Sequence, residues 1–151
     1  MKDQKEIIAD LKGLINILND GKEGYKDAVN HVKSEELKST FIEFSNQRSA
    51  DAEELKAHIL MHGGESDNED GGVLGALHRT WLGIKEAFAS NEDKAILNAI
   101  KTGEEAALEK YDDVLKHYEN HADHYDLLTK HRAGIQKALN KIKILEVEFN
   151  D

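Results

Sequence analysis

The chain contains no cysteine and no proline, and it has no long apolar run. Without thiols, disulfide bonds, zinc–thiolate sites and cysteine nucleophiles are excluded, and a reducing compartment is compatible with the composition. Without an apolar stretch of about 20 residues, no segment is suited to span a membrane. The opening residues, MKDQKEIIAD, carry charges where a secretory signal needs apolar side chains. We therefore expect a cytoplasmic protein that makes no membrane contact.

Basic residues are too few to balance the acidic ones. The 20 Lys and Arg residues stand against 30 Asp and Glu residues, which gives a formal net charge of -10. A surface of this sign repels phosphate backbones, so we expect no nucleic acid partner. The residues that are plentiful, Ala, Leu, Lys and Glu, favour long helices. We expect residues 1–151 to form one all-α domain, a size that buries roughly two thirds of the surface exposed by the unfolded chain.

Apolar residues recur at the spacing of an α-helix over residues 3–33 and again after Ser34. Asp3 and Glu6 form a capping pair at the start of the first segment. Ser34, which two acids follow, is the predicted N-cap of the second segment, and Gly63–Gly64 ends that segment. So short a connection between two long helices predicts that they lie antiparallel.

A connection and a second pair of helices follow. Residues 63–72 are acidic and bounded by glycines, which predicts a surface loop. Residues 73–88 predict a short amphipathic helix that carries Trp81. The third long helix is expected to begin at Ser90 or Asn91, either of which can cap it.

The break between the third and fourth long helices is weakly marked, because residues 117–126 contain neither Gly nor Pro. Asn120 or Asp123 is the expected cap. One unbroken helix over residues 92–149 would extend about 87 Å and leave its apolar face without a partner. We therefore predict a ferritin-like four-helix bundle, in which a crossover with a short extra helix joins two antiparallel helix pairs.

Several polar side chains share the apolar stripe of their helix and are expected to form a polar core. A lone charge inside a bundle is very costly, so the inward Arg48 and Glu104 predict a hydrogen-bonded ion pair. His131 is expected to donate to a carboxylate or a carbonyl, with metal ligation as the alternative. The side chain of Asp51 is also expected to point into this polar core. For Lys22 we favour a side chain that reaches past the edge of the core to water.

A di-iron or di-manganese centre needs an inward Glu from each of two helices and a Glu-x-x-His motif from each of the other two. Glu23 lies far from the centre of its stripe. Glu54 and His58 are spaced by four residues instead of three, and Glu54 points sideways. The positive charges of Arg48 and Lys22 would also repel two divalent cations, so no cofactor is favoured. The candidate ligands for the alternative, an iron or manganese site, are Glu104, His131, Glu23, Glu54 and His58.

Histidines gather near the turn between the third and fourth helices. His117, His121 and His124 lie about one turn apart, with Asp123 among them. Such a group can share a zinc or nickel ion. We favour the interpretation that it is a solvated helix end.

Four segments resemble a known family, namely DGKEGY at 20–25, MHGGE at 61–65, GALHRTW at 75–81 and GEEAALEKY at 103–111. In the same order, they are similar to the uncharacterised bacterial ferritin-like four-helix-bundle proteins grouped as domain of unknown function 2383. The resemblance implies a ferritin-like fold and no established activity. The family's Gly-Glu pair matches Gly103 and Glu104.

The favoured hypothesis is a bundle that is not an enzyme, in which Arg48 and Glu104 lock the helices in one register. The first alternative is a metal-dependent oxidase or iron-handling protein. The second is a helical interaction module, in which the short helix around Trp81 offers an apolar surface for a homodimer.

Overall fold

Long helices make up most of the described chain. The structure is a computed structural model, and it describes residues 3–64, 84–90, 92–120 and 122–149. Within these residues the long helices are α1 (Gln4–Val29), α2 (Glu35–Met61), α4 (Asp93–Leu115) and α5 (Ala122–Glu148). A further helical turn at residues 84–88 precedes α4. The described residues contain no strand, so the predicted all-α class is confirmed.

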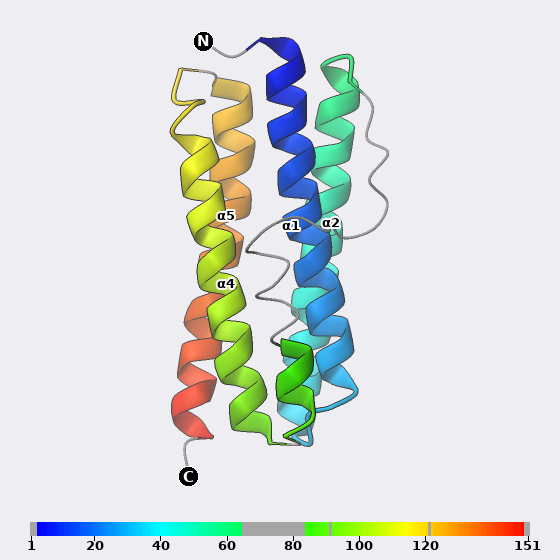
Figure 1. Ribbon diagram of the computed structural model, residues 1–151, viewed down its shortest axis with the longest axis vertical. Coiled ribbons are helices and arrows are strands. Elements are labelled where there is room, and N and C mark those ends of the chain that lie inside the picture. The colour runs from blue at the N-terminus through cyan, green and yellow to red at the C-terminus, as the bar shows by residue number, and fades with distance from the viewer. Residues whose placement is uncertain (1–2, 65–83, 91, 121, 150–151) are drawn as a thin grey trace.

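The helices form two antiparallel pairs. Figure 1 shows α1 beside α2 and α4 beside α5, and most interhelix contacts lie within these pairs. α2 ends at the opposite end of the bundle from the start of α4, as two helix pairs joined by a crossover require (Figure 1). This is the wiring of the predicted ferritin-like bundle. The predicted loop at 63–72 and the short helix with Trp81 lie largely outside the described residues, as does Trp81 itself.

Side chains cap the first two helices where the sequence predicted them. Asp3 Oδ1 accepts a hydrogen bond from the Glu6 amide at 2.8 Å. Ser34 Oγ accepts one from the Leu37 amide at 3.3 Å. Each cap satisfies an amide that the first turn of a helix leaves without a partner, and so fixes where the helix begins.

The first helix ends earlier than the predicted residue 33. α1 stops at Val29, and Asn30 is its C-cap. The amides of Lys33 and Ser34 donate to the two carboxylate oxygens of Asp93, at 2.8 and 3.1 Å. The chain can leave the helix here because this carboxylate, at the start of α4, supplies the acceptors that another helical turn would have provided.

The start of the third long helix also differs from the prediction. Glu92, not Ser90 or Asn91, is the N-cap of α4. Ser90 Oγ donates to the carbonyl of Ala87 at 2.6 Å and accepts from the Glu92 amide at 3.3 Å. Ser90 therefore closes the preceding helical turn, and Asn91 lies outside the described residues.

The last two helices are separate, so the unbroken helix over 92–149 is excluded. α4 ends at Leu115, with Lys116 as its C-cap. In the connection that follows, Tyr118 is fully buried, and its hydroxyl donates to Asp10 Oδ2 of α1 at 2.6 Å. Burial of a large aromatic side chain with a satisfied hydroxyl anchors the turn where local stop signals are lacking.

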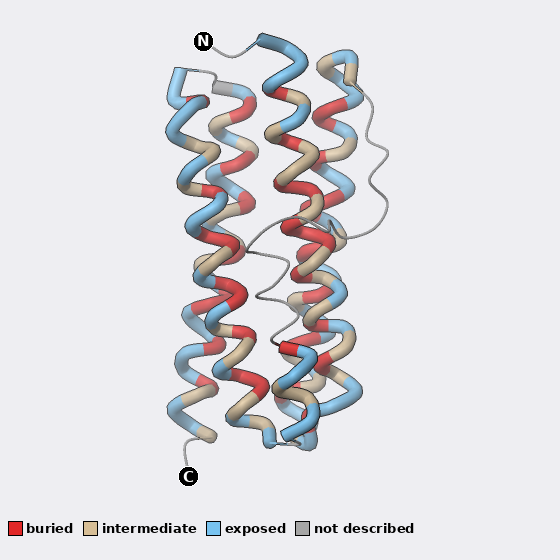
Figure 2. The backbone as a smooth tube through the Cα atoms, viewed as in Figure 1, coloured by how far each residue is buried: buried red, intermediate tan, exposed pale blue. Residues whose placement is uncertain are grey.

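The core is built from apolar stripes on all four long helices. Figure 2 shows the buried positions recurring along each helix, with exposed positions between them. Burying a Leu, Ile or Phe side chain contributes roughly 1.5–3 kcal/mol. None of the described helices is both long enough and apolar enough to cross a bilayer. Buried residues of the core include Leu11, Leu14, Leu18, Phe41, Leu55, Ile100, Tyr111, Leu128, Ile135 and Leu145.

Asp93 ties the start of α4 to the turn between α1 and α2, so its removal should destabilise the bundle. Asp93→Ala deletes the acceptor of two backbone amides, and we expect the free energy of unfolding to fall by about 1–2 kcal/mol. Urea denaturation followed by circular dichroism measures the change. Asp113→Ala is the control, because Asp113 is exposed and pairs with Lys116 on its own helix. Its effect should stay within about 0.5 kcal/mol. Equal losses in the two variants would contradict the assignment.

Candidate functional site

The centre of the bundle contains a buried ion pair. Arg48 of α2 and Glu104 of α4 have side chains that are 2% and 0% exposed, and Arg48 Nη2 bonds Glu104 Oε2. The structure thus brings together the two charges that the sequence placed in the core. Their attraction offsets the cost of removing both from water. Because the two residues come from different helix pairs, the bond links the two halves of the bundle.

Tyr25 of α1 is the third member of this polar group. Its hydroxyl donates to Glu104 Oε2 at 2.6 Å. Its ring centroid lies 5.6 Å from the guanidinium carbon of Arg48, close enough for a cation–π attraction. Sequence reasoning counted Tyr25 only as an apolar residue of its stripe. A tyrosine at such a position gives no sign of the partner that its hydroxyl will meet.

The charges of the centre control its protonation. Burial is the largest single influence on the pKa of Arg48 and lowers it, but the charge and hydrogen bond of Glu104, together with Tyr25 and Tyr111, more than compensate, so the pKa is raised. Burial, together with the negative charge of Glu104, raises the pKa of Tyr25 well above its usual range. Burial also raises the pKa of Tyr111, and the charge of Asp51 adds to this. At neutral pH the centre therefore holds a cationic guanidinium and protonated phenols.

Gly21 of α1 makes room for the guanidinium. A Cβ atom built on this buried glycine would overlap Arg48 Nη1. That nitrogen cannot move aside freely, because Glu104 holds Arg48 Nη2 and the side chain is enclosed. Glycine in a helix interior is destabilising by roughly 0.5–1 kcal/mol relative to Ala. The close approach of Arg48 explains why a glycine stands here.

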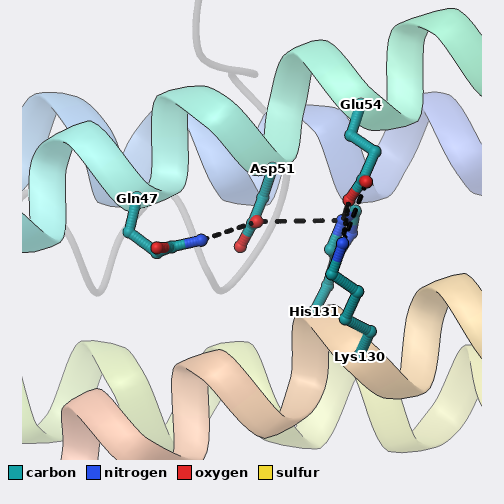
Figure 3. Close-up of polar contacts among 5 residues, drawn as sticks. All are labelled: Gln47, Asp51, Glu54, Lys130 and His131. Atoms are coloured by element: carbon teal, nitrogen blue, oxygen red, sulfur yellow. Dashed lines mark hydrogen bonds and ion pairs between the residues drawn. The ribbon is translucent and has the colours of Figure 1, made fainter.

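A second polar group lies between α2 and α5 (Figure 3). His131 Nε2 lies 2.7 Å from Glu54 Oε1 and 3.8 Å from Asp51 Oδ1. Lys130 donates to both Glu54 oxygens, at 3.2 and 3.0 Å, and Gln47 donates to Asp51 Oδ1 at 3.0 Å. The buried His131 therefore has the carboxylate partner that the sequence led us to expect. Glu54 is 41% exposed, in line with its predicted sideways position, yet its carboxylate reaches the histidine.

The pKa values of the two carboxylates in this group, Asp51 and Glu54, are shifted in opposite directions. Burial raises the pKa of Asp51, and the neighbouring His131 offsets part of that rise. The hydrogen bond from His131, and then the one from Lys130, lowers the pKa of Glu54. Donor atoms of Asp51, Glu54 and His131 lie within 4.8 Å of one another, as a metal site would require. Lys130, however, already occupies the same oxygens of Glu54.

A third polar group lies where α2 ends and α5 begins. Donor atoms of His58, His62, Asp123 and His124 all lie within 4.8 Å of one another. His58 Nε2 is 2.7 Å from His124 Nδ1, and His62 Nε2 is 2.8 Å from Asp123 Oδ2. The three imidazole rings have centroids 4.6, 4.8 and 4.9 Å apart. Nitrogen and oxygen donors thus converge at one end of the bundle.

The sequence predicted a different histidine group, and the structure divides it. His117 is exposed in the connection between α4 and α5 and does not belong to the third group. His121 lies outside the described residues. Asp123 and His124 instead meet two histidines from the last turns of α2. Nothing local in the sequence shows that the end of one helix faces the start of another so distant along the chain.

Lys22 and Glu23 lie at the edge of the bundle, not in its centre. Their side chains are 29% and 52% exposed, and the charged groups lie 3.8 Å from each other. The position of Lys22 agrees with the favoured prediction that its side chain reaches water. The polar core therefore does not include Lys22, and Glu23 has no inward carboxylate to offer a metal.

The residues of the centre do not fit a di-iron or di-manganese site. Arg48 and Tyr25 already bond Glu104 Oε2. Glu104 Oε1 and Arg48 Nη1 are buried and have no protein partner among the described residues, but the guanidinium would repel a cation placed beside it. The Glu-x-x-His motif that two helices supply in the ferritin-like carboxylate proteins does not occur in this sequence.

Comparisons with known proteins agree with the fold. Residues 6–117 match the model of the family described as Domain of unknown function (DUF2383). A search of curated proteins gives no significant match. Among solved structures, a mutant of Dps1 from Mycobacterium smegmatis is similar over 97% of this chain and 99% of its own, with a TM-score of 0.75 and 13% sequence identity. At this identity the likeness shows a shared ferritin-like fold and nothing further.

The close approach at Gly21 can be tested with two matched glycines of α1. A Cβ atom at Gly13 meets nothing within 4 Å, so Gly13→Ala should raise the free energy of unfolding by about 0.5–1 kcal/mol. Gly21→Ala should lower it by about 1–3 kcal/mol, because the added methyl group displaces Arg48. Urea denaturation measures both. Stabilisation by both substitutions would show that the guanidinium does not need the space.

Alkaline pH should destabilise the fold through its buried phenols. Burial raises the pKa of Tyr25, Tyr111 and Tyr118, and for Tyr118 the hydrogen bond to Asp10 adds to the effect. Unfolded tyrosines lose their protons near about pH 10, so above that pH the folded state binds more protons than the unfolded state. The stability present below about pH 10 is then lost as the pH rises, by about 1.4 kcal/mol per pH unit for each tyrosine.

Phenolate absorbance measures this effect directly. In native protein we expect most of the four tyrosines to ionise at higher pH than they do in guanidinium chloride. Tyr25→Phe should remove one of the delayed groups. Coincident titration curves in the native and the denatured protein would contradict the assignment.

Proposed function

The chain belongs to the family described as Domain of unknown function (DUF2383), and we propose that it is a ferritin-like helical bundle without catalytic activity. In this proposal an ion pair closes the centre of the bundle, where ferritin-like carboxylate proteins bind two metal ions. The observation that carries the proposal is the buried bond between Arg48 and Glu104.

Electrostatics supports the absence of a di-metal centre. A unit charge placed about 4 Å from another interacts with it by about 4 kcal/mol at an effective dielectric constant of about 20, and a divalent ion doubles this figure. The guanidinium of Arg48 would therefore repel each of two divalent cations bound about 4 Å away by roughly twice that unit-charge energy. The single negative charge of Glu104 is already balanced by Arg48, so it cannot also neutralise two divalent ions.

The same group supports a structural role. The Arg48–Glu104 bond connects α2 to α4, and the Tyr25–Glu104 bond connects α1 to α4. A slip of α4 by one turn moves Glu104 by about 5.4 Å, which would break both bonds and leave each charge buried alone. The polar centre thus favours one axial alignment of the two helix pairs.

A metal-dependent oxidase or iron-handling protein is the first alternative. The observation that favours it is the convergence of Asp51, Glu54 and His131 within 4.8 Å. A metal at that position would have to displace Lys130 from Glu54. Binding of two equivalents of iron, together with catalysed iron oxidation, would replace our proposal with this one.

A helical interaction module is the second alternative. It depends on Trp81, which lies outside the described residues, so it remains a prediction from the sequence. Sedimentation at several protein concentrations would test whether the chain forms a homodimer, and a strictly monomeric result would remove this alternative.

Loss of the central carboxylate should be among the most damaging single changes. Glu104→Ala leaves Arg48 charged and uncompensated, and we expect the free energy of unfolding to fall by about 3–5 kcal/mol. Glu105→Ala is the control, because Glu105 is the exposed neighbour on the same helix, and its effect should stay within about 0.5 kcal/mol. Chemical denaturation measures both. A loss below about 1 kcal/mol for Glu104→Ala would mean that the pair is not buried in solution.

Metal analysis of untagged protein tests the catalytic alternative separately. We expect no catalysed oxidation of added ferrous iron and no pair of bound iron or manganese ions. Two bound iron ions whose retention depends on Glu104 or Glu54 would overturn the proposal.

A further inference from the structure

The histidine group at the end of the bundle is independent of the central ion pair. His58 lies in the last turn of α2 and His62 is the C-cap of that helix, and His58 follows Arg48 by ten residues, or about 15 Å along the helix. Asp123 and His124 lie in the first turn of α5. Neither the proposed scaffold role nor the central polar group uses any of these four side chains.

Their geometry is close to that of a tetrahedral metal site. With metal–ligand distances of about 2.0–2.2 Å, tetrahedral ligand atoms stand about 3.3–3.6 Å apart. His58 Nε2 and His124 Nδ1 are 2.7 Å apart, and His62 Nε2 and Asp123 Oδ2 are 2.8 Å apart. All four donor atoms lie within 4.8 Å of one another. Opening the two short contacts by less than about 1 Å and closing the longer ones by at most about 1.5 Å would bring one donor from each residue into such an arrangement.

The local chemistry favours a cation. His58 Nε2 and His124 Nδ1 face each other at 2.7 Å, so at least one of these two nitrogens carries a lone pair, which is the form that binds a metal ion. His62 Nε2 is a buried atom without a well-directed hydrogen bond among the described residues, although Asp123 Oδ2 lies beside it. Asp123 supplies negative charge, and its ion-pair partner here is a histidine instead of a lysine or an arginine.

The donor set selects the class of ion. Imidazole nitrogens suit Zn²⁺ and its neighbours Co²⁺, Ni²⁺ and Cu²⁺, whereas Mg²⁺ and Ca²⁺ prefer oxygen ligands. Three nitrogens and one carboxylate oxygen make a closed set for a four-coordinate ion, which is typical of a structural site. The group formed by Asp51, Glu54 and His131 is not a closed ligand set of this kind, because Lys130 already pairs with the carboxylate of Glu54.

We propose that His58, His62, Asp123 and His124 bind one zinc-class divalent cation, which joins the C-terminal end of α2 to the N-terminal end of α5. These two helices belong to different helix pairs and make few direct contacts. The ion therefore links the two pairs at one end of the bundle, between helices that make few direct contacts. Its role is to hold the bundle together, and it is separate from any di-metal chemistry at the centre.

Calorimetric titration of untagged, metal-free protein with Zn²⁺ tests the proposal. We expect one bound equivalent with a Kd below about 1 μM, and a rise in Tm with added Zn²⁺. His62→Ala and Asp123→Ala should each weaken binding by more than about 100-fold, since even the loss of an outer-shell partner costs about 10–100-fold. Both side chains are partly exposed, so these variants should fold, which far-UV circular dichroism checks.

His117→Ala is the matched control, because this exposed histidine lies in the nearby connection but outside the group. It should bind Zn²⁺ like the unmodified chain. Co²⁺ substitution should add the visible absorption of a tetrahedral site, and this signal should be absent in folded His62→Ala. The proposal is overturned if no stoichiometric binding occurs, if His62→Ala and Asp123→Ala bind as tightly as the unmodified chain, or if His117→Ala loses binding to the same extent.

Discussion

The bond between Arg48 and Glu104 is the constraint on which the rest of the bundle depends. Both side chains are almost completely removed from water, so neither charge is tolerable without the other. Their neighbours are arranged around this need, because Gly21 leaves space for the guanidinium and the hydroxyl of Tyr25 bonds the shared carboxylate oxygen. In our proposal, the protein's own charges neutralise each other at the central position of the ferritin-like fold.

Two polar groups lie between α2 and α5. The group around His131 and the group around His58 follow one another along α2, and each meets side chains from the first half of α5. Most interhelix contacts lie within the helix pairs, whereas α2 and α5 make few contacts and are joined by hydrogen bonds, ion pairs and, in our inference, a bound cation. Such an interface gives directional contacts at the boundary where the two helix pairs meet.

Periodicity predicted the helices, their order and the crossover, because apolar spacing and capping residues are local signals. The caps at Asp3 and Ser34 illustrate this. Errors arose where a distant group decides a boundary, as Asp93 does at the end of α1. Inward charges could be found because Arg48 and Glu104 share the apolar stripes of their own helices.

The sequence predicted a contact between side chains of different helices only where a buried charge would otherwise have had no counter-charge. That argument paired the guanidinium with the carboxylate, but it did not reveal the hydroxyl of Tyr25, which is neutral. It also could not predict the contact of His58 and His62 with the start of α5, since residues at a helix end can reach water and need no buried counter-charge. The comparisons with known proteins add the fold and a family without a named activity.

The most direct measurement is a double-mutant cycle between Arg48 and Glu104. Unfolding free energies of Arg48→Met, Glu104→Gln and the double variant, obtained by urea denaturation, give the coupling between the two groups. A buried, mutually dependent pair predicts a coupling of about 2–3 kcal/mol, with the double variant more stable than the sum of the single losses allows. A coupling below about 0.5 kcal/mol would contradict the claim that this ion pair closes the centre of the bundle.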